Sequence, residues 1–324
     1  MTDLIKFKLN LAPGDTLVAT SAIRDLHLAY PDKFKTTFVG TAGYLFDNNP
    51  YISQMSLREE RYAEDIQLRY PLINSSNKNS YHFIHGFRKH LEKELNLIIP
   101  PTEMRGDVHI SDKEKYNPLI EGDYWVIFAG GKYDFTAKWW NPHYYQSVID
   151  HFKGTIKFVQ AGLEKHFHPK LNGVVDMIGK CEDRKIINLI YHSVGVVTPV
   201  SFGMHLASAV PSSKMVNRAC VVIAGGREPV QWEMYPWHKF LHSVGTMDCC
   251  AKGGCWKSRC QQVGDGDKKD NPERMCEYPV ELSNNISCEY NPLSIPKCMY
   301  DIKPQDVIHA IESWYNGGVL EYGV

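Results

Sequence analysis

The chain has 324 residues, a length that favours two domains over one. Hydrophobic residues make up 43% of it, which indicates a packed globular protein and excludes a disordered one. The formal net charge of -1 offers no overall basic surface, so neither a nucleic-acid binder nor a membrane-surface binder is favoured. No run of about eighteen apolar residues is present, and no transmembrane helix is predicted.

The N-terminal part of the chain predicts the start of a parallel α/β sheet. Charges interrupt the first apolar run, so it is typical of a strand and not of a signal peptide, and we expect a cytoplasmic protein. Alternation and an apolar stripe predict a strand at 5–11, a helix at 18–30 and a strand at 35–40. A further helix is expected at 81–97, weakened by Gly86 near its start.

The pattern restarts after a boundary near 115–122, and the second part again alternates strands with helices. The chain therefore predicts two α/β units in sequence. The second unit is expected to contain strands at 124–131, 155–162, 194–200 and 219–226, and helices at 141–152, 183–193, 202–210 and 304–315.

Loops at the carboxyl ends of parallel strands are where such proteins bind ligands. The segments to consider are "APGD", "AGGKYDFTAKWW", "TPVSFGMH" and "AGGRE". No strand is followed by G-x-G-x-x-G, and neither a Walker A loop nor a G-x-S-x-G elbow occurs. Simple dehydrogenases and hydrolases are therefore disfavoured.

Three residues in these loops could carry chemistry. Asp15 follows Gly14 at a strand-to-helix turn, where it is either an N-cap or a general base that a helix N-terminus keeps ionised. Lys138 precedes a helix N-terminus, as a phosphate-binding cation or as a solvated loop lysine. His205 is either a core histidine or part of a ligand pocket, because small and hydroxyl side chains surround it.

The motifs taken together resemble the family 9 glycosyltransferases, the ADP-heptose-type heptosyltransferases. "GDTLVATSAIRDLHLAYP" is similar to their N-terminal Gly-Asp turn and helix, and "AKWWNPHYYQSVID" to their K-x-W-P-type segment. "VVTPVSFGMHLASAV" resembles their D-[ST]-G-x-x-H-L-A loop and helix, preceded by a similar Gly-Lys segment in "MIGKCEDRKIINLIYHS". The resemblance is strong over 10–40 and 120–226.

This resemblance implies a GT-B fold, with two Rossmann-like domains facing a cleft. The acceptor-side domain would span 1–118 and the nucleotide-sugar domain 119–324. The implied reaction is inverting transfer of a heptose or related sugar from a nucleotide-diphosphate donor to a hydroxyl of a glycan or protein acceptor. It requires neither a catalytic metal nor a dinucleotide, and an oligomer is compatible with it.

The same resemblance assigns roles to individual residues. Asp15 would be the general base, and Lys138 would neutralise the departing diphosphate. Val200 stands where the family has aspartate, which leaves the donor sugar open. The expected donor-binding residues are Gly14, Thr16, Lys138, Thr198, Ser201, Gly203, Met204 and His205.

The cysteines form a separate feature. Seven of the nine lie within 249–298, and such crowding in a reducing compartment favours a metal over disulfides or structural thiols. One branch of family 9, the autotransporter heptosyltransferases, carries a similar cluster that binds one iron. We expect a small module at about 247–300 holding one structural iron or zinc ion through Cys250, Cys255, Cys276 and Cys298. Cys249 competes with Cys250, whereas Cys260 and Cys288 are expected to be spare.

Three other functions stay open at this stage. The same fold could transfer a sugar to a modified nucleic-acid base, although the neutral charge disfavours it. A non-catalytic scaffold is compatible with Val200 in place of the aspartate. An epimerase-like enzyme would turn over the nucleotide sugar alone.

Overall fold

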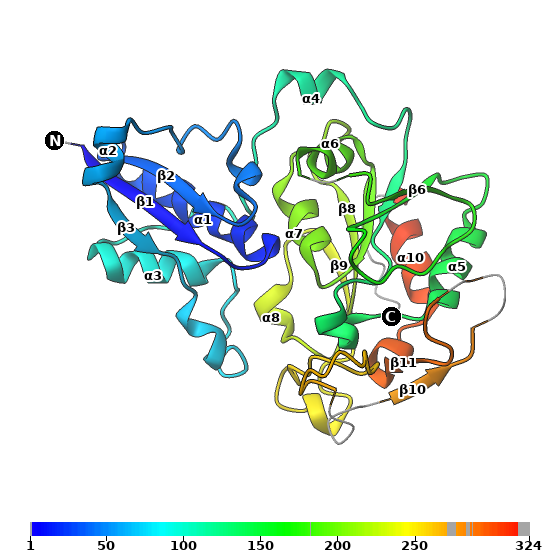
Figure 1. The fold of residues 1–324 in the computed structure, drawn as a ribbon. Coiled ribbons are helices and arrows are strands. Elements are labelled where there is room, and N and C mark those ends of the chain that lie inside the picture. Colours follow the sequence, from blue (N-terminus) through cyan, green and yellow to red (C-terminus); the bar gives the residue numbers. More distant parts are fainter. Residues whose placement is uncertain (1, 182, 271–276, 283–285, 287, 317–324) are drawn as a thin grey trace.

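The computed structural model describes residues 2–181, 183–270, 277–282, 286 and 288–316. Two parallel sheets lie side by side, one in each half of the chain (Figure 1). This confirms the predicted α/β class. Among the described residues, no helix combines the length and the apolar character that crossing a bilayer requires.

The N-terminal unit is built on a three-stranded parallel sheet in the order β2-β1-β3. Alternate residues Ile5, Phe7 and Leu9 of the central strand β1 are buried, as expected for period-2 patterning. The elements of this unit are β1 (Asp3–Leu9), α1 (Pro13–Ala29), β2 (Phe34–Gly40), η1 (Gly43–Phe46), α2 (Leu57–Tyr62), β3 (Glu64–Gln67), η2 (Pro71–Ser75) and α3 (His85–Leu95).

Helix α1 is buried on most of its surface, because it packs against both α3 of its own unit and α7 of the other unit. Polar residues on α1 are consequently buried as well. Arg24, for example, hydrogen-bonds the backbone oxygens of Glu103 and Arg105 in the chain that leaves the unit. Helix α1 therefore lies at the junction of the two units.

The C-terminal unit has six parallel strands in the order β6-β5-β4-β7-β8-β9. The chain order reverses between β4 and β7, which is the arrangement of a doubly wound sheet and creates a crevice at their carboxyl ends. Its elements are β4 (Trp125–Ile127), η3 (Tyr133–Lys138), α5 (Pro142–His151), β5 (Phe158–Gly162), β6 (Val174–Ile178), α6 (Arg184–His192), β7 (Gly195–Pro199), α7 (Phe202–Ala209), β8 (Ala219–Gly225), α8 (Val230–Glu233), β9 (His238–His242) and α10 (Pro304–Tyr315).

A short helix, α4 (Asp112–Tyr116), connects the two units and is fixed to the second one (Figure 1). Ser111 and Glu114 form a capping box at its start. Glu114 also accepts from Arg184 at the start of α6, at 2.7 Å, so the cap and the connection share one carboxylate. The predicted domain boundary at 118–119 falls between α4 and β4.

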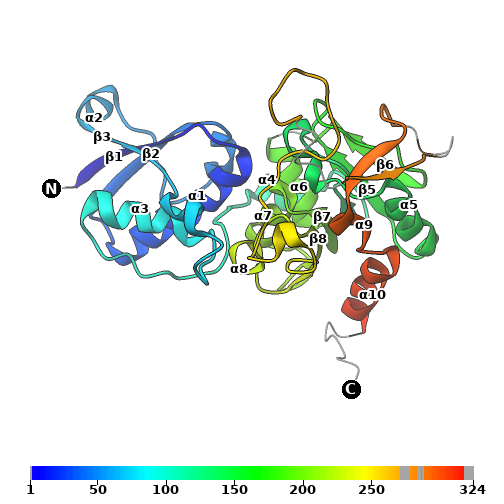
Figure 2. The same ribbon diagram turned by 90° about the horizontal axis from the view of Figure 1, so that it is seen from below.

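The cysteine-rich chain after β9 lies on one side of the C-terminal unit (Figure 2). It contains η4 (Asp248–Cys250), the antiparallel pair β10 (Glu277–Val280) and β11 (Leu293–Pro296), and α9 (Lys297–Tyr300). Met299 and Ile302 are buried in the core of the large sheet. The segment is therefore anchored to the core at its C-terminal end before α10 begins.

Candidate active site

The carboxyl ends of β4, β7 and β8 supply most of the polar residues at the junction. Lys138 ends η3 after β4, Ser201 caps α7 after β7, and Arg227 and Glu228 follow β8. These loops lie at the point where strand order reverses, which is the usual ligand position of such sheets. The N-terminal unit contributes the first turn of α1 from the other side: a Cβ on Gly14 would lie 3.2 Å from Cδ2 of His205.

Asp15 occupies the third position of α1, and the N-cap is Ala12. The expected N-cap role is thus replaced by the reverse half of a capping box, in which Asp15 Oδ2 accepts from Ala12 N at 3.1 Å. Burial raises the pKa of Asp15, and this outweighs the lowering by the Ala12 N–H, by Lys132, by a Tyr70 hydrogen bond and by Lys138. The carboxylate is therefore a stronger base than a helix N-terminus alone predicts.

Lys138 is not a solvated loop lysine. Its ammonium forms an ion pair with Glu228 Oε1 at 2.6 Å and donates to the Val200 carbonyl at 3.0 Å. Burial alone would raise the pKa of Glu228, but the Arg227 and Lys138 cations together hold it below its ordinary value. Arg227 Nη1 also pairs with Glu228 Oε1, so two cations share one carboxylate.

His205 lies in α7 and is buried. Its Nδ1 is 2.8 Å from the Tyr235 hydroxyl, and its Nε2 is 4.0 Å from Glu233 Oε2. That separation would be an ion pair only with a protonated ring, but burial lowers the pKa of His205 to about 3. Burial and the neighbouring Glu228 raise the pKa of Glu233 to about 8. Both groups are therefore neutral at pH 7.

The remaining predicted donor-binding residues divide into two groups. Ser201 Oγ accepts from Gly203 N at 3.3 Å and lies 3.1 Å from the Thr198 hydroxyl, so these residues build the start of α7. Thr16 and Met204 are fully buried, and the Thr16 hydroxyl donates to Thr41 O at 3.2 Å. These two contribute packing at the junction, and their contact with a donor stays a prediction.

Four polar residues at the junction were missed by the sequence analysis: Tyr70, Arg227, Glu228 and Glu233. The segment "AGGRE" was singled out as a loop, but its charges were not assigned. Arg227 donates through Nε to Lys257 O and stacks over Phe135, with the guanidinium 4.9 Å from the ring centroid. The position of "AGGRE" after a predicted strand indicates a loop, but only the fold shows that Glu228 is buried between two cations.

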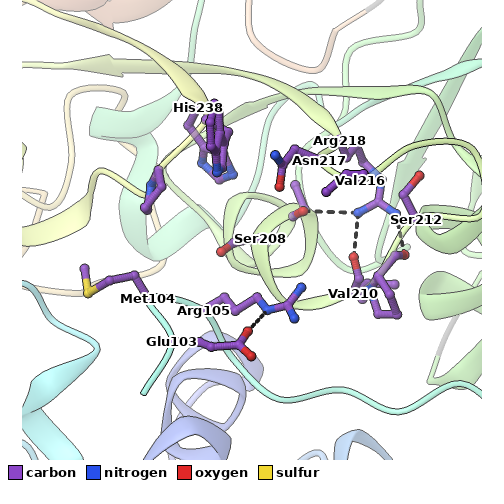
Figure 3. A pocket seen from close by; sticks show the side chains of 14 residues that line it. Glu103, Met104, Arg105, Ser208, Val210, Ser212, Val216, Asn217, Arg218 and His238 are labelled. Carbon is purple, nitrogen blue, oxygen red and sulfur yellow. Dashed lines mark hydrogen bonds and ion pairs between the residues drawn. The ribbon is translucent and has the colours of Figure 1, made fainter. Parts of the chain in front are cut away.

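One cavity lies away from these residues. It has a volume of about 450 Å³ and is lined by residues from the connecting chain, the C-terminal end of α7 and the start of β9 (Figure 3). Arg218 at its wall donates to Ala207 O in the last turn of α7, at 3.1 Å, and to O of the C-cap Val210, at 2.9 Å, which satisfies carbonyls at this helix end. None of the predicted catalytic or donor-binding residues lines this cavity. The charged groups converge instead at the junction of Asp15 and Lys138, which is therefore the candidate active site.

A much smaller cavity of about 20 Å³ lies between the cysteine-rich segment, Ala137 of η3 and Arg227 after β8. Four cysteines line it: Cys249, Cys255, Cys260 and Cys298. Cys250 lines no part of it; its thiol lies 3.6 Å from Ser243 O. The cavity has room for about one water-sized guest.

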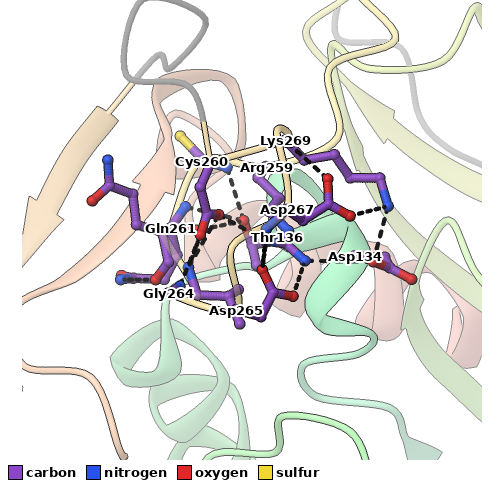
Figure 4. Close-up of polar contacts among 12 residues, drawn as sticks. Asp134, Thr136, Arg259, Cys260, Gln261, Gly264, Asp265, Asp267 and Lys269 are labelled. Carbon is purple, nitrogen blue, oxygen red and sulfur yellow. Dashed lines mark hydrogen bonds and ion pairs between the residues drawn. The ribbon is translucent and has the colours of Figure 1, made fainter.

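A polar network fixes Cys260 and its neighbours to η3 (Figure 4). Thr136 Oγ1 accepts from Cys260 N at 2.8 Å and from Gln261 N at 3.0 Å. The fully buried Arg259 side chain pairs with Asp265 at 2.7 Å and Asp270 at 2.8 Å. The segment is thereby held against the same short helix that ends in Lys138.

The predicted metal ligands are only partly tested by this arrangement. Cys276 lies outside the described residues. Within the described residues, no group of three or more His, Cys, Asp or Glu side chains is placed to hold a metal ion. The four thiols around the small cavity are the donor type that iron and zinc accept, so their chemistry fits such a site although their placement does not form one.

Similarity to known proteins is found at the level of structure and not of sequence. No family model matches the sequence, and no curated protein matches it. A family 9 glycosyl transferase from Veillonella parvula DSM 2008 is 12% identical, with a TM-score of 0.64 over 97% of this chain and 98% of that one. The E. coli ADP-heptose LPS heptosyltransferase II is 13% identical, with a TM-score of 0.63 over 98% and 99%.

The iron-containing dodecameric glycosyltransferase TibC from enterotoxigenic E. coli H10407 is also similar. It is 16% identical, with a TM-score of 0.62 over 98% of this chain and 80% of that one. Identities this low carry the fold and not the activity. The two parallel sheets, their junction and these similarities together show that the chain has the GT-B fold of glycosyltransferases, as the sequence predicted.

Proposed function

We propose that the protein is a glycosyltransferase that moves a sugar from a nucleoside-diphosphate donor to a hydroxyl of a glycan or protein acceptor. The observation that carries this proposal is the convergence of Asp15 and Lys138, from different units, on one buried junction. Lys138 is near enough to lower the pKa of Asp15. A base and a cation on opposite sides of one site suit a displacement between an entering hydroxyl and a departing diphosphate.

The reaction would proceed as a single displacement. The acceptor oxygen forms a bond to the anomeric carbon while its proton passes to the Asp15 carboxylate. The bond between the anomeric carbon and the diphosphate oxygen breaks, and its electron pair leaves with the nucleoside diphosphate. Lys138 and Arg227 stabilise that charge, together with the N–H groups at the start of α7. Attack opposite the leaving group inverts the anomeric centre.

The structural similarities support the donor class. One of the similar structures is TibC in complex with ADP-D-β-D-heptose, at a TM-score of 0.61 and 16% identity. An ADP-linked sugar is therefore the first donor to test. A heptose is one candidate for the transferred sugar, and Val200 presents only its carbonyl to Lys138.

A second part of the proposal is one structural metal ion in the cysteine-rich segment. The residue types support it, because four cysteines are among the residues that line one small cavity. A bound metal would fix the segment that carries Trp256, whose Nε1 donates to Asn77 of the other unit at 2.8 Å. As ligands we propose Cys249, Cys255, Cys260 and Cys298, because they line this cavity and Cys250 does not, in contrast to the set expected from spacing.

Metal content tests this part. Elemental analysis of the purified protein should find one equivalent of iron or zinc, and Cys249→Ser should lose it while Cys250→Ser retains it. Loss in Cys250→Ser with retention in Cys249→Ser would contradict the cavity-based assignment and restore the spacing-based one. Absence of metal from the wild type would overturn the metal site.

The transferase proposal is tested by nucleotide binding. Thermal unfolding should be measured with ADP, UDP and GDP and with a sugar-linked form of each. At least one nucleoside diphosphate should raise the midpoint in wild type. Lys138→Met, which keeps the length of the side chain without its charge, should reduce that rise. Stabilisation of wild type by none of the ligands would overturn the proposal.

A further inference from the structure

Two carboxyl groups at the junction have no part in the displacement described above. Glu228 follows β8 and Glu233 ends α8, and both are more than nine-tenths buried. Each has one oxygen, Oε2, that is buried without a hydrogen-bond partner among the described residues. Buried polar atoms normally have partners. These two stand out among the unpartnered buried atoms because Glu228 contacts Lys138 and Arg227, and Glu233 Oε2 lies 4.0 Å from His205 Nε2. Both oxygens could therefore bind a ligand at the junction.

The two groups differ in protonation. Glu228 is ionised, because Lys138 and Arg227 together lower its pKa despite its burial. Both cations bind its Oε1, which leaves Oε2 as a charged acceptor. An ionised acceptor requires a donor and repels phosphate. Its missing partner is therefore a hydroxyl or N–H group and not the diphosphate.

Glu233 carries its proton at neutral pH, since burial and Glu228 raise its pKa to about 8. A protonated carboxyl group both donates and accepts. Together, the two side chains offer an acceptor and a mixed donor–acceptor. Hydroxyl groups match this pair, because each hydroxyl donates one hydrogen bond and accepts others.

The position of the pair identifies the ligand group. Glu228 contacts Lys138, on the diphosphate side, while the charge of Asp15 acts on the pKa of Glu233. The transferred sugar must lie between the base and the diphosphate. We infer that Glu228 and Glu233 bind hydroxyl groups of the transferred sugar and determine which sugar the site accepts. This inference rests on the proposed transferase function.

Paired titrations separate the sugar from the nucleotide. ADP-D-β-D-heptose and ADP-glucose are each compared with ADP by calorimetry, and UDP-glucose with UDP. In wild type, at least one nucleotide sugar should bind more tightly than its own nucleoside diphosphate. Glu233→Ala should lose about tenfold or more of the affinity for that sugar, while the affinity for the nucleoside diphosphate changes less than about twofold.

Two further variants make the result specific. Glu233→Gln keeps a donor and an acceptor and should recover most of the sugar affinity. Glu312→Ala, the same truncation on the exposed face of α10, should match wild type with both ligands. Retained nucleoside diphosphate binding in Glu233→Ala shows that the variant is folded.

Failure of the transferase proposal and failure of this inference alone give different results. If wild type binds none of the nucleotides, the transferase proposal fails, and this inference fails with it. If wild type binds them but Glu233→Ala weakens the sugar and its nucleoside diphosphate equally, or neither, only the inference is overturned. Preserved sugar affinity in Glu233→Ala together with a loss in Glu233→Gln would also overturn it.

Discussion

The pKa of a carboxylate shifts in opposite directions on the two sides of the junction. On the N-terminal side, burial raises the pKa of Asp15, which accepts hydrogen bonds from the Ala12 N–H and the Tyr70 hydroxyl. On the C-terminal side, Glu228 is more deeply buried, yet its pKa is lowered because Lys138 and Arg227 both bind it. Burial therefore determines the direction of the pKa shift at Asp15, whereas contact with two cations determines it at Glu228. The N-terminal side suits proton transfer, and the C-terminal side suits the binding of charge.

The largest expected effect is on the rate of sugar transfer and concerns Asp15 on the N-terminal side. Asp15→Asn keeps the size of the side chain and its hydrogen bond capacity but removes the base. Release of nucleoside diphosphate from the nucleotide sugar in the presence of acceptor should fall by a factor of about 10²–10⁴. An unchanged rate in a folded Asp15→Asn protein would show that the base lies elsewhere.

The next effect concerns the pH dependence of stability on the C-terminal side. In the unfolded chain Glu233 loses its proton near its ordinary pKa of 4.5, whereas the folded protein retains it up to about 8. Between these values the folded state binds the extra proton, so stability falls as pH rises, by roughly 1.4 kcal/mol per pH unit from this group. Below pH 4.5 the group contributes no slope.

Glu233→Gln should remove this contribution. Urea unfolding of wild type and variant between pH 5 and pH 8 should show a difference in unfolding free energy that changes steadily across the window. His205 has the opposite pH dependence. Its pKa is about 3 in the folded protein, so below the ordinary value of 6.5 the unfolded chain binds a proton that the folded protein does not, and stability decreases as pH falls. A constant difference between wild type and Glu233→Gln would mean that Glu233 is ionised in the folded protein.

A third effect tests how tightly the donor side is built. A Cβ on Gly203 would lie 2.5 Å from Phe128 Cδ2 and 2.8 Å from the Thr198 hydroxyl. Gly203→Ala should cost about 1–3 kcal/mol of unfolding free energy in urea. Gly43→Ala is the matched control, since nothing lies within 4 Å of its added Cβ. Equal stability of the two variants would contradict the described packing of α7.

The smallest expected effect distinguishes a loss of stability from a loss of ligand binding. Ser201→Ala and Ser56→Ala each remove the side-chain cap of one helix, at a cost of about 1 kcal/mol by thermal unfolding. Only Ser201 lies at the junction, so only Ser201→Ala should also weaken nucleoside diphosphate binding. A similar loss of binding in Ser56→Ala would argue against a specific role for the start of α7.

The sequence predicted the α/β class and the loops that meet at the junction, because buried strands and helix starts have local signals. The helix at 304–315 was placed correctly, whereas the helix expected at 81–97 begins only at His85. The strands at Val174–Ile178 and His238–His242 were missed. They lie at the two edges of the large sheet, where partly exposed residues weaken the apolar pattern.

The roles of Glu228 and Glu233 could not be predicted in the same way. Their charge states depend on Lys138, which is ninety residues earlier in the chain, and on burial by both units. The cysteines show the same limit. Spacing favoured Cys250 and left Cys260 as spare, and that ligand set stays a prediction. Thr136 Oγ1 of η3 accepts from Cys260 N beside the small cavity, and no local pattern indicates that contact.

The most direct test of the account is a titration of ADP, or of whichever nucleoside diphosphate stabilises the wild type, into wild type, Asp15→Asn and Lys138→Met. Asp15→Asn should bind as wild type does, and Lys138→Met should lose about tenfold or more of the affinity, because the diphosphate is proposed to bind only on the C-terminal side. Equal affinity in Lys138→Met and wild type, or a loss in Asp15→Asn alone, would contradict the assignment of the two sides.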